Sequence, residues 1–170
     1  MKIIKALLLS ISLSFTAHAS IEMTAVEPIK GQITIDVPKG FTLMADDMLK
    51  RKYPSENRPK IVYTNQSGTV NVAINHTKMP LTDNKLDELK DFMLESMKNY
   101  QPQVKEVMVD NKKAYILDFI SHATDTDIHN LMLITPYNGT VLFVTFNTTK
   151  DEEANYLEAG KSSLMSIKFK

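Results

Sequence analysis

The chain of 170 residues contains no cysteine and no tryptophan, and it has only five glycines. Without cysteine it forms no disulfide, offers no thiol nucleophile and lacks the residue that anchors an exported lipoprotein. Its few glycines form neither a phosphate-binding loop nor the G-x-G-x-x-G pattern of dinucleotide-binding proteins, and a G-x-S-x-G nucleophile elbow is also missing. These absences disfavour nucleotide-dependent enzymes and Cys or Ser hydrolases, so we expect no catalytic residue and no cofactor.

Positive and negative charges are balanced in this sequence. Twenty basic and twenty acidic residues give a formal net charge of 0, and no basic stripe is present. Proteins that bind nucleic acid concentrate lysine and arginine on one face or along one helix. The sequence therefore disfavours nucleic acid as a partner.

The N-terminus has the pattern of a secretory signal peptide. Lys2 and Lys5 form a short basic start, an apolar run covers residues 6–15, and small residues occupy positions Ala17 and Ala19. We expect cleavage after Ala19 and export, most simply into a bacterial periplasm. Because the apolar run is shorter than the roughly 20 residues that span a bilayer, we expect no transmembrane span in the mature chain.

Three β-rich runs dominate the middle of the chain. They cover residues 114–122, 128–136 and 140–147, and the last two are separated by Asn138-Gly139. The Asn-Gly pair is the strongest short signal for a hairpin turn, so the runs predict an antiparallel meander. The outer runs are apolar on both faces and therefore need cover on both sides. Their alternating sets are Tyr115, Leu117 and Phe119 against Ile116 and Ile120, and Val141 and Phe143 against Leu142, Val144 and Phe146.

Two amphipathic helices can supply this cover. An apolar stripe with spacings of three and four runs through residues 83–100, and a second helix is expected over residues 151–167. Gly160 in the second helix would let its backbone approach the sheet closely. Further strands are expected over residues 32–37, 60–64, 69–76 and 103–109, with short elements at 41–44 and 46–53.

Together these elements predict an α+β fold, in which an antiparallel β-sheet of about six or seven strands is sandwiched between helices. The helix at 83–100 is expected on one face and the helix at 151–167 on the other. The chain would comprise the signal peptide at 1–19, an extended N-terminal arm at 20–30 and a single domain at 31–170.

Two short segments and the order of the elements carry a family resemblance. The sequence IDVPKGF at residues 35–41 is similar to a strand followed by P-x-G-aromatic, and the closing helix ends in SIKF at 166–169. With the strands of 114–146, this pattern over residues 31–170 resembles the PsbP-like fold family. That family includes the extrinsic photosystem protein PsbP, a Ran-binding nuclear import factor and bacterial DcrB-type proteins. The resemblance implies an α/β/α sandwich with a non-enzymatic binding or assembly role.

Three functions remain open on the sequence. The first is an exported non-catalytic binding or assembly protein of the bacterial envelope, which acts through contacts with another envelope or secreted protein. The alternative is a periplasmic immunity protein that neutralises a secreted toxin. One DcrB-like branch is similar to cytoplasmic chaperones for apolar helices of type VI secretion effectors, and the signal peptide departs from that branch. The sequence does not identify partner-binding residues.

The second alternative is a metal-binding protein, and its candidate ligands are His122, Asp125, Asp127 and His129. In a hairpin with a loop at 123–126, His122 would face Asp127, and Asp127 and His129 would share one face. Imidazoles and carboxylates both suit zinc and other transition metals. The spacing matches no dedicated metal motif, and Asp and Thr are common turn residues. We therefore expect an exposed hairpin tip without a bound metal.

Methionine is abundant, with ten residues in the whole chain. Met93 and Met97 stand one turn apart on the predicted long helix. Methionine usually fills irregular gaps in a core, but Met-rich surfaces also adapt to varied apolar partners and thioethers can bind copper(I). Core filling is the favoured interpretation, and sulfurs that line an open groove would favour a binding role.

Overall fold

The computed structural model describes residues 20–170, and the expected signal peptide at 1–19 lies outside these described residues. A large sheet contains β3 (Thr42–Leu43), β4 (Ile61–Thr64), β5 (Val70–Pro80), β6 (Gln103–Val109), β7 (Lys112–His122), β8 (Asp127–Tyr137) and β9 (Thr140–Thr149). A small sheet contains β1 (Met23–Ile29), β2 (Ile33–Pro38) and β10 (Lys168–Phe169). The strand orders are β3-β4-β5-β9-β8-β7-β6 and β1-β2-β10, and neighbouring strands are antiparallel.

The helices are α1 (Asp46–Lys52), α2 (Leu86–Ser96) and α3 (Glu153–Met165). Short 3₁₀ turns extend the last two elements: η1 (Asp83–Lys85) and η2 (Lys98–Tyr100) flank α2, and η3 (Lys150–Glu152) precedes α3. The predicted helix at 83–100 is therefore present as α2 with a 3₁₀ turn at each end, and Met97 forms a turn between α2 and η2. The predicted helix at 151–167 ends at Met165, because the chain then turns into β10 of the small sheet.

The predicted meander is confirmed as strands β7, β8 and β9. Tyr137 pairs with Thr140 across a two-residue loop, and Asn138 and Gly139 have positive φ angles of 50° and 75°. Both central residues of a type I′ turn need positive φ, which Asn and Gly adopt at the lowest cost. Loop length and turn type thus fix the register of β8 against β9.

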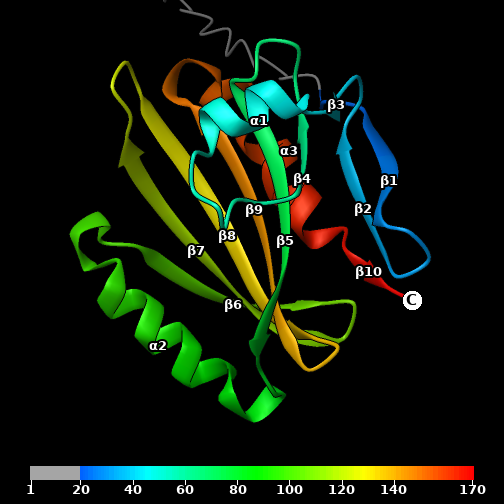
Figure 1. Cartoon of the computed structure of the whole chain (residues 1–170), viewed down its shortest axis with the longest axis vertical. Helices are drawn as coiled ribbons and strands as arrows, with labels where there is room; N and C mark the ends of the chain where they lie inside the picture. The colour runs from blue at the N-terminus through cyan, green and yellow to red at the C-terminus, as the bar shows by residue number, and fades with distance from the viewer. Residues whose placement is uncertain (1–19) are drawn as a thin grey trace, which may run out of the picture.

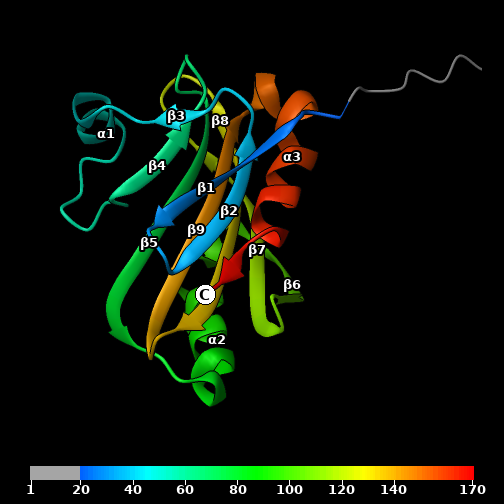
Figure 2. The same cartoon turned by 90° about the vertical axis from the view of Figure 1, so that its right-hand side faces the viewer.

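Three layers build the molecule. Figure 1 shows α1 and α2 on the near side of the large sheet and α3 behind it. In Figure 2, turned by a quarter, the small sheet and α3 lie together along the opposite face of the large sheet. The predicted placement of the two long helices on opposite faces is confirmed.

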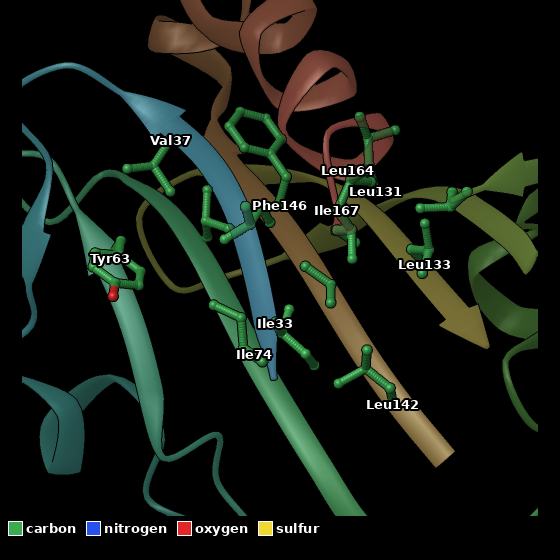
Figure 3. Packing of buried hydrophobic residues seen from close by; sticks show 14 of the residues in the cluster. Ile33, Val37, Tyr63, Ile74, Leu131, Leu133, Leu142, Phe146, Leu164 and Ile167 are labelled. Carbon is green, nitrogen blue, oxygen red and sulfur yellow. The ribbon is translucent and has the colours of Figure 1, made fainter. Parts of the chain in front are cut away.

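The main core lies between the large sheet, β2 and α3, and Figure 3 shows its side chains at close range. Phe146 of β9 and Leu164 of α3 are fully buried in it, as is Ile33 of β2. A Cβ atom built on Gly160 would lie 2.3 Å from the Phe146 ring. The backbone of α3 therefore lies directly against the aromatic ring, and the close approach that was expected at Gly160 is confirmed.

On the other face, α2 and α1 cover separate parts of the large sheet. The α2 side chains Leu86, Leu89 and Met93 pack with Tyr115, Leu117, Phe119 and Ile134 from the strands. The α1 side chains Met48 and Leu49 pack with Val62 and Ala73 instead. The alternation predicted for residues 115–120 is confirmed, because the odd-numbered residues face α2 and Ile116 packs against the main core.

The N-terminal segment differs in detail from the expected extended arm at 20–30. Residues Met23–Ile29 form β1, which pairs antiparallel with β2. Because this pairing satisfies one edge of β2, and β10 satisfies the other, the small sheet covers the main core as a unit.

Candidate binding cleft

A cleft with a volume of about 440 Å³ opens over the large sheet on the side that carries α1 and α2. Its walls contain Met93 of α2 and, after α1, Tyr53 and Pro59. Three strands supply its floor, through Ala73 and Asn75 of β5, Asn130 and Met132 of β8, and Phe143, Thr145 and Asn147 of β9. We call this site the α1–α2 cleft. Its volume is in the range typical of small-ligand pockets.

A row of carboxamides reaches the floor, where Asn130 and Asn147 line the cleft and Asn71 is buried beside it. Asn71, Asn147 and Asn130 are direct cross-strand neighbours on β5, β9 and β8. The Asn71 amide donates to Asn147 Oδ1 over 2.8 Å, and the Thr64 hydroxyl donates to Asn71 Oδ1 over 2.7 Å. The Asn147 amide donates in turn to the Tyr53 hydroxyl over 3.4 Å. These bonds connect the sheet to the segment after α1 and hold the row in place.

Other polar groups on the floor have hydrogen-bonding capacity to spare. The Asn130 amide donates to Ser121 Oγ and to the Ile128 carbonyl, each over 2.9 Å. Its Oδ1 atom accepts no hydrogen bond from the described part of the chain, and Asn75 and Thr145 make no side-chain hydrogen bond within it. A carboxamide provides both donor and acceptor, and a hydroxyl does the same. The cleft therefore presents convergent, uncharged polar groups.

The remaining lining is apolar and uncharged. Phe143, Met132 and Met93 contribute ring and thioether surface. Burial raises the pKa of the Tyr53 phenol, so this side chain is neutral at physiological pH. No Asp, Glu, Lys, Arg or His occurs among the described residues that line the cleft. Such a lining suits an uncharged ligand, because a buried charge would find no partner there.

The sequence indicated a few residues of the cleft, but it did not predict that they form one site. Strand alternation places Asn71, Ala73 and Asn75 on one face, and Met93 was a candidate for a groove-lining sulfur. Met93 lines the cleft and also packs against the apolar cluster under α2, whereas Met97 packs against that cluster and does not line the cleft. Sequence reasoning missed the row of carboxamides, because the row depends on how three strands align.

The four candidate metal ligands do not form one cluster. His122 and Asp127 pair across the hairpin as predicted, with His122 Nδ1 at 2.6 Å from Asp127 Oδ1. The His122 side chain is 76% exposed, so this pair belongs to an exposed tip. Within residues 20–170 no three His, Cys, Asp or Glu side chains are arranged to hold a metal ion. That the tip binds no metal stays a prediction.

The expectation that His129 belongs to the exposed tip is wrong. Its side chain is 11% exposed and lies between β7 and the start of α3. His129 Nε2 is 2.7 Å from Asp118 Oδ1, and its Nδ1 is 3.4 Å from Glu153 Oε1. A hydrogen bond from Lys150, and then the contact with His129, lower the pKa of the Glu153 carboxyl. The residue acts as a bridge between sheet and helix, a role that only the tertiary arrangement reveals.

Comparisons with known proteins match the fold. No family model and no curated protein sequence matches the chain. Cyanobacterial PsbP (CyanoP) from Synechocystis aligns with a TM-score of 0.60 and 16% identity, over 94% of this chain and 98% of the other. LpqN, involved in cell envelope biogenesis of Mycobacterium tuberculosis, aligns with a TM-score of 0.53 and 13% identity, over 88% and 91%. A protein from Bacteroides thetaiotaomicron aligns with a TM-score of 0.55 and 11% identity, over 81% and 45%.

At these identities the likeness concerns the fold, and the chain has the PsbP-like α+β fold that its sequence pattern predicted. None of the helices within residues 20–170 is long and apolar enough to cross a membrane. Because fold alone does not determine function, the function has to be inferred from the residues that line the cleft.

Proposed function

We infer that this chain is an exported, non-catalytic binding or assembly protein of the bacterial envelope, which contacts another envelope or secreted protein through the α1–α2 cleft. The observation that carries this proposal is the uncharged cleft of about 440 Å³, with an apolar lining and a few convergent polar groups. This combination is the usual composition of a binding site.

The chemistry of the cleft favours binding over catalysis. General acid–base catalysis and nucleophilic catalysis need titratable or activated groups close to the reacting atoms. The described lining offers two hydroxyls, on Tyr53 and Thr145, and neither has an acidic or basic side chain beside it in the lining. Carboxamides and thioethers recognise a ligand without activating it.

Two further observations support a location in the envelope. The signal-peptide pattern at 1–19 favours export, and LpqN, which is involved in cell envelope biogenesis, has a similar fold. The periplasmic fraction of producing cells should contain a protein whose intact mass corresponds to cleavage after Ala19. Protein that retains residues 1–19 in this fraction would contradict the proposal.

Site-specific photo-cross-linking in cells tests the contact surface. A photoreactive phenylalanine analogue at Phe143 lies in the cleft, and the same analogue at the exposed Glu158 of α3 serves as the matched control. We expect position 143 to capture one defined envelope or secreted protein that position 158 does not capture. Equal capture at both positions, or none at position 143, would refute the cleft as the contact surface. A secreted toxin as the captured protein would instead support the immunity role.

A further inference from the structure

A concentration of positive charge borders one wall of the α1–α2 cleft. Residues 50–60, the last turn of α1 and the loop after it, contain five basic residues and one acidic residue, and one of the five, Arg51, pairs with Asp47 of α1. Two lining residues, Tyr53 and Pro59, belong to this segment. Lys50 and Lys60 are exposed and form no ion pair with another described residue. We call residues 50–60 the basic rim.

The floor beside this rim is uncharged, but it can form hydrogen bonds with a ligand. Asn75, Thr145 and the Asn130 carbonyl oxygen retain hydrogen-bonding capacity, and they project from the strands among apolar side chains. A carboxamide matches a peptide group, because each has one carbonyl acceptor and N–H donors. Partner backbone that enters the cleft can therefore satisfy these groups, and its apolar side chains can contact Phe143.

The conformation of the occupant follows from the same groups. Backbone N–H and C=O groups inside a helix already bond to each other, so a helical segment offers none of them to the floor. An extended segment leaves these groups free along its whole length. The floor carboxamides therefore select an extended segment over a helical one.

On these grounds, and resting on the proposed function, we propose that the α1–α2 cleft binds an extended segment of the partner in which uncharged apolar residues are flanked by acidic residues. The apolar residues enter the cleft, and the acidic residues meet the basic rim. Exposed charges of this kind attract a partner of opposite sign, and they weaken binding when the sign is reversed.

Titration calorimetry with blocked peptides tests the sequence preference on the mature chain. The probe is acetyl-Asp-Asp-Leu-Leu-Asp-Asp-amide, and the controls are acetyl-Lys-Lys-Leu-Leu-Lys-Lys-amide and acetyl-Asp-Asp-Ser-Ser-Asp-Asp-amide. We expect the probe to bind at least tenfold more tightly than either control, and its affinity to fall as salt is added. No binding of the probe, or equal binding of the three peptides, would overturn the proposal.

Single substitutions locate the bound peptide. Lys60→Glu should weaken the probe at least fivefold, whereas Lys30→Glu, at the exposed turn between β1 and β2 on the opposite side of the large sheet, should leave its affinity unchanged. Thr145→Val removes one hydroxyl that bonds no described residue, and it should weaken the probe severalfold without lowering the melting temperature. Equal effects of the two lysine substitutions would contradict a role for the basic rim.

Failure of this inference is distinguishable from failure of the proposed function. If position 143 captures a partner in cells but the partner contacts the cleft through a segment without acidic residues, the contact surface stands and the inference is wrong. If position 143 captures nothing, the proposed function itself is wrong. Mass-spectrometric mapping of the cross-linked residue on the partner shows whether the segment that contacts the cleft contains acidic residues.

Discussion

Gly160 shows how one missing side chain sets the distance between helix and sheet. An ideal Cβ atom there would lie 2.3–2.5 Å from three atoms of the Phe146 ring, far inside van der Waals contact. The ring is fully buried, so it has little room to move away. Glycine in a helix normally costs about 0.5–1 kcal/mol relative to alanine, but here the steric term is larger and of opposite sign.

We therefore expect Gly160→Ala to destabilise the protein by about 1–3 kcal/mol, measured by urea denaturation. The double variant Gly160→Ala with Phe146→Leu should show coupling, because the smaller side chain makes room for the new methyl group. Ser162→Ala, at an exposed position of the same helix, is the control for helix propensity. Stabilisation by Gly160→Ala would show that the helix can shift away from the sheet.

Glu153 gives the fold a defined response to acid. Its pKa is lowered from the ordinary value of 4.5, first by the hydrogen bond from Lys150 and then by His129, while partial burial opposes the shift. A carboxyl with a lower pKa in the folded state than in the unfolded state stabilises the fold above the unfolded value. This contribution is lost as the pH falls through the folded pKa.

The melting temperature of the wild-type protein should thus fall between about pH 5 and pH 3, and Glu153→Gln should reduce this decline. The neutral amide keeps the shape of the carboxylate but not its charge. Glu56→Gln, at an exposed position without an ion pair to another described residue, serves as the matched control and should leave the decline intact. Identical pH profiles for wild type and Glu153→Gln would rule out this contribution.

At the scale of elements, α2 is attached to the large sheet by one polar cluster as well as by apolar contacts. The Tyr115 hydroxyl lies 2.6 Å from Asp87 Oδ1 and 3.1 Å from Glu106 Oε2. Lys113 Nζ lies 2.8 Å from Asp87 and 3.3 Å from Glu106. The Asp87 carboxylate raises the pKa of Tyr115 and of Lys113, and the bond from Lys113 lowers the pKa of Asp87. The cluster therefore joins α2 to β6 and β7.

Tyr115→Phe removes the hydroxyl and leaves the buried ring in place. Because the remaining apolar contacts still hold the fold, we expect faster hydrogen exchange at α2 amides with little change at β8 and β9. Tyr156→Phe, which removes an α3 hydroxyl that bonds no described residue, should leave α2 exchange unchanged. If α2 exchange is unaffected by Tyr115→Phe, the apolar stripe alone holds the helix.

The sequence predicted the elements well because their signals are local. Asn138-Gly139 specifies a turn, the stripe at 83–100 specifies a helix, and the residues of 115–120 specify two buried faces. Pairing between distant segments has no such signal. Neither the separate small sheet nor the alignment of Asn71, Asn147 and Asn130 is encoded within a short window. The polar floor of the cleft depends on this alignment, so the sequence alone does not predict the cleft.

At the scale of the whole molecule, two sheets share a single core. Ile33 and Ile35 of β2 pack in the same cluster as Val72 and Val144 of the large sheet and Leu164 of α3. The small sheet has three strands, of which β10 has only two residues, and the buried apolar side chains of β2 pack into the cluster formed with the large sheet and α3. The small sheet and the large sheet should therefore unfold together.

Ile35→Ala tests this cooperativity. Ile35 is 1% exposed, and loss of a buried isoleucine side chain typically destabilises by about 2–5 kcal/mol. If the sheets unfold as one unit, the free energy of exchange at central amides of β9, such as Val144, should fall by the same amount as the global stability. Thr34→Ala, on the other side of β2, should change neither quantity by more than about 0.5 kcal/mol. Undiminished protection of β9 in Ile35→Ala would show that the small sheet opens independently, and the main core would then have to be assigned to the large sheet and α3 alone.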